Sequence, residues 1–306
     1  KAFGKGKIRS RKGCETGMNQ YRTDLAIECQ EILDESAGIQ MEKIEYNGGI
    51  RVTRIKIISQ EAAKKMGKPV GSYITLEADG VLEEEDGIKE KTAKAVAGEL
   101  GQLLRVDYTL KVLVAGLGNS LVTPDRLGPE TAAKVRVTRH LFVIFDADGD
   151  EEMSNVSCII PGVTGSTGME TAEVIKKAAE IVKPDVVIVI DSLAARDIDR
   201  VSTTIQLTDT GIQPGSGMGN HRAGINEENI GVPVLAIGVP TVIDIKTILR
   251  DALEENLDSA EAVEKYLSDY DRQMIVTSTD IDILVKDFSD IIADGINKTL
   301  HPGIYS

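Results

Sequence analysis

Short runs of apolar and β-branched residues recur along the second half of the chain, and this repetition constrains the fold more than any other feature. The runs lie at residues 111–119, 140–145, 157–162, 185–195, 203–209 and 233–240. Several are almost continuously apolar, which is typical of strands buried on both faces. Helical patterns separate some runs, as at 170–183, and further helices are expected near 244–268 and 279–299. This alternation predicts an α/β fold with a mixed, mostly parallel sheet flanked by helices.

The first third of the chain has a different pattern, in which strands follow one another directly. Residues 26–38 predict a short amphipathic helix. Residues 43–58 predict two strands joined at Asn-Gly-Gly, a strong hairpin signal. A third strand at 72–81 would complete a small antiparallel β layer near the N-terminus, and a helix is expected at 83–104.

Composition argues against several classes of protein. The formal net charge of −14 disfavours direct nucleic-acid binding, and 4% aromatic residues with no Trp provide few stacking surfaces. No apolar run approaches the ~18 residues that a membrane span needs. Three scattered cysteines without metal-ligand spacing favour a reducing, cytoplasmic environment. The first twenty residues are basic, unlike the rest, and lack the apolar core of a secretory signal.

Acidic side chains and glycine-rich loops follow the predicted strands. Because ligands bind beyond the carboxyl ends of parallel strands, Asp125 and Asp191 are expected to approach each other there. Two neighbouring carboxyl groups cannot both ionise cheaply, so one stays protonated as a general acid while the other acts as a base towards water. Such a pair can hydrolyse a peptide bond without Ser, Cys or metal. The alternative is a structural role, with helix capping by Asp191 or neutralisation by Arg126 and Arg196.

Other motifs are weaker. Gly116 and Gly118 begin a dinucleotide fingerprint, but Leu121 occupies the position of its third glycine, and no P-loop occurs. The tripeptide Asp209-Thr-Gly matches that of pepsin-like and retroviral proteases. It occurs once, in a chain of the wrong fold class, so we interpret Asp209 as a turn-forming or supporting residue. Ser216 lies in a glycine-rich loop without an evident base.

A metal site is a further possibility at the strand ends. Asp125, Glu170, Asp191 and His221 could converge as oxygen and nitrogen ligands, although their spacing does not demand it.

Long blocks of sequence carry a more specific signal than any of these short motifs. They run in order from residue 21 to 302: "YRTDLAIE", "GLGNSLVTPDRLGP", "VTRHLF", "PGVTGSTGMET", "KPDVVIVIDSLAAR", "TIQLTDTGIQPGSGMGNHR", "GVPVLAIGVPTVID" and "ADGINKTLHP". In these blocks the chain resembles the germination proteases of spore-forming bacteria. The resemblance implies a cofactor-independent, aspartic-type endopeptidase of the spore core, a homotetramer, that degrades small acid-soluble spore proteins. It also implies a fold similar to the hydrogenase-maturation proteases.

The resemblance assigns roles to particular residues. Asp125 and Asp191 lie in the two motifs that hold the family's proposed catalytic aspartates. The family is made as a zymogen that removes its own N-terminal segment, and it cleaves after Glu in motifs similar to Thr-Glu-(Phe/Ile)-Ala-(Ser/Val)-Glu. Residues 23–28 fit this pattern with Asp24 in place of Glu, which implies self-cleavage between Asp24 and Leu25. Residues 1–24 would then be a leader and pro-segment, with 1–17 either an artificial or a natural extension.

The remaining expectations concern the surroundings of the two aspartates. Residues 25–306 would form one catalytic domain with a β-rich insertion at about 40–82. Loops 161–171 and 209–222 would shape the cleft and supply backbone N–H donors to the developing oxyanion. Arg222 or His221 would read the glutamates of the substrate, and supporting roles are predicted for Glu170, Arg196 and Asp209. Two alternatives stay open: a metal-dependent or metal-recognising maturation-type protease, and a non-catalytic α/β binding module.

Overall fold

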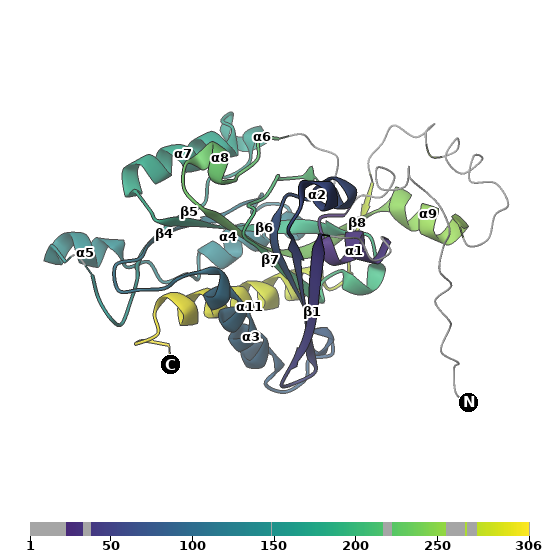
Figure 1. Ribbon diagram of the computed structural model, residues 1–306, viewed down its shortest axis with the longest axis horizontal. Helices are drawn as coiled ribbons and strands as arrows, with labels where there is room; N and C mark the ends of the chain where they lie inside the picture. Colours follow the sequence, from purple (N-terminus) through teal and green to yellow (C-terminus); the bar gives the residue numbers. More distant parts are fainter. Residues whose placement is uncertain are drawn as a thin grey trace.

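The computed structural model describes residues 23–32, 38–147, 149–216, 222–254, 267 and 274–305. Within these ranges, nine strands form one sheet in the order β1-β2-β3-β7-β8-β6-β4-β5, and β9 pairs with β8 (Figure 1). The strands are β1 (Ile39–Tyr46), β2 (Ile50–Ile57), β3 (Gly71–Glu77), β4 (Lys111–Gly116), β5 (Asn155–Ile159), β6 (Val186–Ala195), β7 (Thr204–Thr208), β8 (Val234–Asp244) and β9 (Ile275–Val276).

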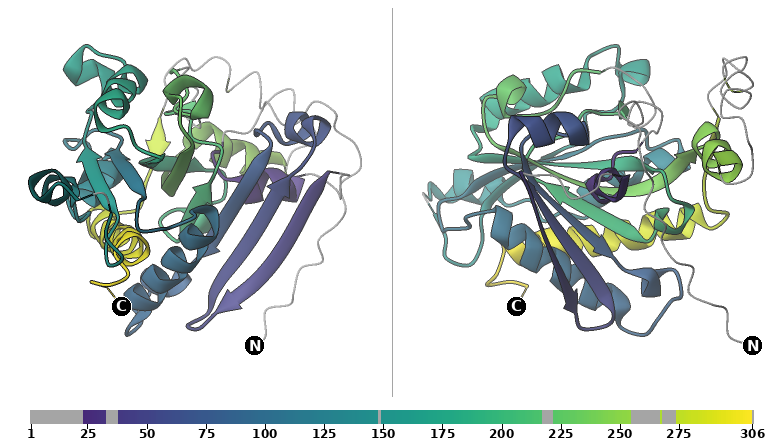
Figure 2. Two further views of the ribbon diagram at one scale, coloured as in Figure 1. Left: turned by 60° about the vertical axis from the view of Figure 1, so that its left-hand side comes forward. Right: turned by 45° about the vertical axis from the view of Figure 1, so that its right-hand side comes forward.

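The sheet has a parallel and an antiparallel part. Strands β5, β4, β6 and β8 run parallel to one another. Strands β1, β2, β3 and β7 form an antiparallel ribbon, and β7 joins it to β8. The predicted α/β class with a mixed sheet and antiparallel strands near the N-terminus is therefore confirmed. The antiparallel strands continue the main sheet rather than lying as a separate layer (Figure 2).

Helices cover both faces of the sheet. On one face, α3 (Ile88–Leu103), α4 (Leu127–Ala132) and α11 (Ile281–Leu300) bury a large aliphatic core against every second residue of the strands. The opposite face is covered in part by α7 (Thr171–Val182). Further along that face, α1 (Ala26–Ile32) and α2 (Gln60–Met66) contribute to a separate cluster with β2, β3 and β6. Among the described helices, none combines the length and apolar character needed to cross a bilayer.

Most predicted elements are present. The hairpin, the third strand and the helices at α1, α3, α7, α9 (Ile245–Glu254) and α11 are observed. The rest of the helices predicted at 26–38 and 244–268 falls largely outside the described residues. The strand predicted at 140–145 is wrong, because this segment is the helix α5 (Arg139–Phe145). A short apolar run does not by itself distinguish strand from helix. Here β5 takes the place beside β4, and α5 buries Phe142 while leaving Phe145 75% exposed.

Candidate active site

A row of three residues across the sheet forms the floor of the site. Asp191 on β6 lies opposite Gly238 on β8, which in turn lies opposite Gln206 on β7. All three belong to the face that also carries α1 and α7, since the alternate residues of these strands join the core on the other face. A Cβ at Gly238 would lie 2.5 Å from Cγ of Leu193, so only glycine fits. The Leu193 side chain occupies the space above Gly238, between Asp191 and Gln206.

Asp191 is a buried acid within a strand, not beyond its end. Its side chain is 5% exposed and accepts a hydrogen bond from the backbone N–H of Ser192 at 2.9 Å. Burial raises the pKa of Asp191 well above its ordinary value, and the charges of Asp125 and Asp24 raise it further. The Ser192 N–H and Arg222 only partly offset this rise. Asp191 therefore keeps its proton well above the pH at which an ordinary Asp loses it.

Asp125 reaches the same place from β4. The chain turns at Gly118, which has φ +113° and so close a contact with the Asp125 carbonyl that no Cβ fits. This turn directs the Asn119 N–H to Oδ2 of Asp125 at 2.8 Å. Burial raises the pKa of Asp125, while Asn119 and the Arg222 charge lower it. Asp125 is less buried than Asp191, so it is the acid of the pair that ionises first.

The buried acid has a consequence for stability that can be measured. In the unfolded chain Asp191 loses its proton near pH 3.9, whereas in the folded chain Asp191 stays protonated to a higher pH. The contribution of Asp191 to stability therefore falls as the pH rises from about 3.9 to the pKa of the folded state. An asparagine side chain at this position would carry no such cost. We expect Asp191→Asn to raise the free energy of unfolding at pH 7 by about 1.4 kcal/mol for each unit of pKa elevation that lies below pH 7. Thermal melts should show a gain at pH 7 that vanishes near pH 4; an equal or lower Tm at pH 7 would contradict the buried, protonated state.

The segment around Asp24 is hydrogen-bonded to the end of β6. Its N–H donates to the Ala194 carbonyl at 2.9 Å, and the Ala194 N–H donates to Oδ2 of Asp24 at 2.9 Å. Ser216 Oγ donates to Oδ1 of Asp24 at 2.7 Å. Asp24 thus has its side chain fixed by two donors, and its charge acts on Asp191.

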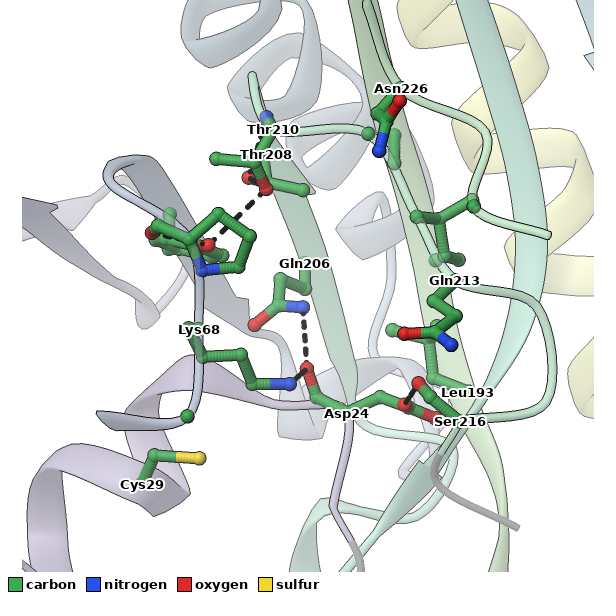
Figure 3. A pocket seen from close by; sticks show the side chains of 18 of the residues that line it. Asp24, Cys29, Lys68, Leu193, Gln206, Thr208, Thr210, Gln213, Ser216 and Asn226 are labelled. Atoms are coloured by element: carbon green, nitrogen blue, oxygen red, sulfur yellow. Dashed lines mark hydrogen bonds between the residues drawn. The ribbon is translucent and has the colours of Figure 1, made fainter. Parts of the chain in front are cut away.

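The peptide groups on either side of Leu25 are also held. The Asp24 carbonyl accepts hydrogen bonds from Lys68 Nζ and from Gln206 Nε2, both at 3.0 Å (Figure 3). The Ala26 N–H donates to Oε1 of Gln206 at 2.7 Å. The side chains of Leu25 and Ala26 are fully buried among α1, α2, β2 and β6. Lys68 and Gln206 therefore hold the carbonyl of the Asp24–Leu25 peptide, and Gln206 also holds the N–H of the next peptide.

Glu28 is the last residue of the bound segment 23–28. Its carboxylate is 2% exposed and accepts the backbone N–H groups of Arg196 at 2.8 Å and Asp197 at 2.9 Å. The Thr23 hydroxyl also donates to it, and the Arg200 guanidinium lies 3.7 Å away. Burial raises the pKa of Glu28, and these four partners oppose that rise. The turn after β6 thus forms a polar socket for this one side chain.

A cavity of about 930 Å³ opens beside Asp24. Its walls include Tyr73. They also include Leu193, Gln206 and Thr208 from the sheet, with Gln213 and Asn226 from the loop that follows β7 (Figure 3). Polar side chains on several sides and a depth that reaches Asp24 suit a length of polypeptide better than a small apolar ligand.

The other predicted site residues have varied positions. Arg222 is half-buried, and its charge acts on both Asp125 and Asp191. Arg196 donates to Glu28 through its backbone, while its guanidinium pairs with Asp251 at 2.7 Å. Glu170 precedes α7 and accepts from Thr164 Oγ1 at 3.4 Å, and Asp209 accepts from the Ser72 N–H at 2.7 Å. His221 lies outside the described residues.

A metal ion at this site would need several of the same acids close together. In the portion of the chain that the structure describes, no three His, Cys, Asp or Glu side chains are grouped closely enough to hold an ion. Because His221 is not among those residues, the predicted set of Asp125, Glu170, Asp191 and His221 is described for three of its members only.

Lys68 and Gln206 are site residues that no sequence motif predicted, whereas Glu28 was predicted only as the last residue of the substrate-like pattern 23–28. Gln206 gave one usable signal, because it is a large amide side chain between Ile205 and Leu207 in the predicted strand 203–209. Lys68 follows Gly67 at the end of a short helix and looks like an ordinary capping sequence.

Comparison with known proteins identifies relatives along nearly the whole chain. A family model described as "Germination protease" matches residues 18–260. A germination protease from Caldanaerobacter subterraneus subsp. tengcongensis is 44% identical over 308 residues, covering 92% of this chain and 95% of the relative. One from Clostridium perfringens is 40% identical, covering 94% and 97%, and one from Bacillus pumilus is 36% identical, covering 93% and 94%.

Proposed function

This chain belongs to the germination protease family, a family of peptidases, and we propose that it is an aspartic-type endopeptidase that begins the breakdown of small acid-soluble spore proteins during germination. One observation carries the proposal: the Asp24–Leu25 peptide is gripped on the sheet face that holds Asp191, and the charges of Asp24 and Asp125 both act on that acid. The held peptide bond and the buried acid therefore belong to the same face of the sheet, which supports the proposal.

The two acids divide the chemistry according to their surroundings. Asp125, the more exposed, takes a proton from water as the water oxygen bonds to the Asp24 carbonyl carbon. Asp191, which holds its proton through burial, gives it to the Leu25 nitrogen as the C–N bond breaks. The products are a carboxyl group on Asp24 and an amine on Leu25. The pair begins and ends with one proton, which returns to Asp191 before the next turnover.

Self-processing follows from the same arrangement. Residues 23–28 match the substrate pattern implied for the family, and each of them has a specific contact or buried position in the site. We propose that the chain is a zymogen. Its pro-segment, which ends at Asp24, would occupy the substrate site of the same chain. Spore proteins bind there once the segment has been removed. Assembly as a homotetramer in the spore core belongs to the same proposal and rests on family membership alone.

The test is a mass measurement on the full chain. Incubation at mildly acidic pH should remove residues 1–24 and leave Leu25 as the new N-terminus. Acid favours the step because lowering the pH populates the singly protonated acid pair, given the raised pKa values of both groups. A chain whose mass stays constant, or one cut elsewhere, would oppose self-processing at this bond.

The metal-dependent alternative makes a different prediction under the same conditions. If Asp125 and Asp191 bound a catalytic ion, exhaustive chelation would stop the cleavage, and added divalent cations would restore it. Cleavage that continues at an unchanged rate after chelation supports the acid pair instead.

A further inference from the structure

We propose that Lys68 and Gln206 form the oxyanion hole for the Asp24–Leu25 bond, and hence for the bond cleaved in any substrate bound in the same way. The inference rests on the proposed function, because it assigns a role in that reaction. Both donors lie 3.0 Å from the Asp24 carbonyl oxygen, within the range at which oxyanion donors act. They come from different parts of the fold, namely the end of α2 and the middle of β7.

Gln206 is oriented by its second hydrogen bond. Its Oε1 accepts the Ala26 N–H at 2.7 Å, so its amide nitrogen must be the atom that faces the Asp24 carbonyl. One side chain thus spans both peptide groups that flank Leu25. It is 6% exposed and stands on a central strand, which keeps the donor fixed during the reaction.

Lys68 is oriented by the end of α2. Gly67 adopts the left-handed conformation with φ 63°, and the Lys68 N–H returns to the Ala63 carbonyl at 3.2 Å. This turn directs the Lys68 ammonium to the Asp24 carbonyl, with a longer contact to the Thr23 carbonyl at 3.4 Å. A positive charge at this point stabilises a negative oxygen more than a neutral carbonyl.

The chemistry requires a donor pair of this kind. As the water oxygen adds to the carbon, the carbonyl π electrons move onto the Asp24 oxygen, and they return when the C–N bond breaks. Backbone N–H donors from loops 161–171 and 209–222 were expected here, but in the described residues the contacts to this oxygen come from side chains. The nearby Ala194 N–H is already bonded to the Asp24 side chain. Lys68 and Gln206 are therefore the groups placed to receive the developing charge.

The test measures the first-order rate of self-cleavage in the full chain, together with hydrogen exchange at Leu25 and Ala26. Lys68→Met removes the charged donor. Gln206→Glu keeps the acceptor for the Ala26 N–H but loses the donor to the Asp24 carbonyl. Each variant should slow cleavage about 100-fold while the exchange protection of Leu25 and Ala26 is retained. Lys68→Arg, which restores a cationic donor, should recover part of the rate.

Matched controls separate charge and folding from the assigned role. Lys65→Met removes an exposed ammonium from the same helix, and Gln60→Glu makes the same chemical change at its exposed start. Both should cleave at the wild-type rate. The proposal is overturned if Lys68→Met and Gln206→Glu cleave within about threefold of the wild-type rate. It is also overturned if their cleavage rates fall only in proportion to a loss of exchange protection at Leu25 and Ala26.

Failure of the proposed function would be recognised separately. If wild type does not cut after Asp24, or if Asp191→Asn cuts at the wild-type rate, the acid-pair mechanism is wrong and this inference falls with it. If Asp191→Asn is inactive but the Lys68 and Gln206 variants are fully active, only the oxyanion-hole assignment is wrong.

Discussion

Replacing Asp191 by Asn is expected to lower the rate of self-cleavage by at least about 10³-fold, the loss typical of removing a general acid. The same loss is expected for Asp125→Asn, because the ionised partner is then missing. Asn keeps the size of each side chain, and the Asn119 and Ser192 N–H groups can still donate to its amide oxygen. Mass spectrometry over time gives the rate for the full chain, and a peptide containing residues 21–30 supplied to wild-type processed protein gives the reference rate in trans.

A control at the other end of the same strand isolates the chemistry. Asp185 is an exposed acid just before β6 that accepts the Lys111 N–H at 2.8 Å. Asp185→Asn makes the same substitution without touching the acid pair and should cleave at the wild-type rate. If Asp125→Asn and Asp191→Asn also retain wild-type rates, the carboxyl groups do not carry the reaction.

The double variant gives further information. Because the two acids act in one proton-transfer sequence, Asp125→Asn with Asp191→Asn should be little slower than either single variant. If the two acids contributed independently, the rate loss of the double variant would instead equal the product of the two single losses. The Tm increase expected for Asp191→Asn shows in the same samples that loss of activity is not loss of folding.

Sequence patterns were sufficient for the parallel strands and for tying Asp125 and Asp191 to two of them. These two strands, β4 and β6, are neighbours in the sheet, so the sheet itself brings the two acids towards each other. The same reasoning failed for residues 140–145, where an apolar run forms an exposed helix. Edge segments lack the constraint of two flanking strands, and the hydrophobic pattern alone does not decide between helix and strand there.

The remainder of the site depends on packing that no local pattern records. Lys68 reaches the Asp24 carbonyl because α2 packs beside α1 in a cluster built from residues far apart in sequence. Gly238 looks like an ordinary strand glycine, although it lies between Asp191 and Gln206 where a Cβ would clash with Leu193. The resemblance of residues 23–28 to a substrate pattern implied cleavage at the Asp24–Leu25 bond. The structure adds the hydrogen bonds and buried contacts that hold these residues.

Glu28→Ala is expected to slow self-cleavage by about 10³-fold, because it empties the socket that positions the segment from its far end. The substitution leaves the Arg196 and Asp197 N–H groups without their acceptor and removes a charge beside Arg200. Breaking one side of a buried ionic contact commonly costs about 3–5 kcal/mol. If this cost falls on docking of α1, hydrogen exchange at Leu25 and Ala26 should speed up in parallel with the loss of rate, unlike the response expected for Lys68→Met.

Two further substitutions on α1 make the argument specific. Glu31 also pairs with Arg200, at 2.6 Å, but it is exposed, so Glu31→Ala should change the rate by less than about threefold. Glu28→Gln keeps an acceptor in the socket and removes the titration. Since burial raises the pKa of Glu28, its contribution to docking is greatest in acid and is lost as pH rises through that raised value. In Glu28→Gln, docking of α1 should therefore depend less on pH than in wild type. If that pH dependence is unchanged and Glu28→Ala cleaves at the wild-type rate, the Glu28 side chain does not position the Asp24–Leu25 bond.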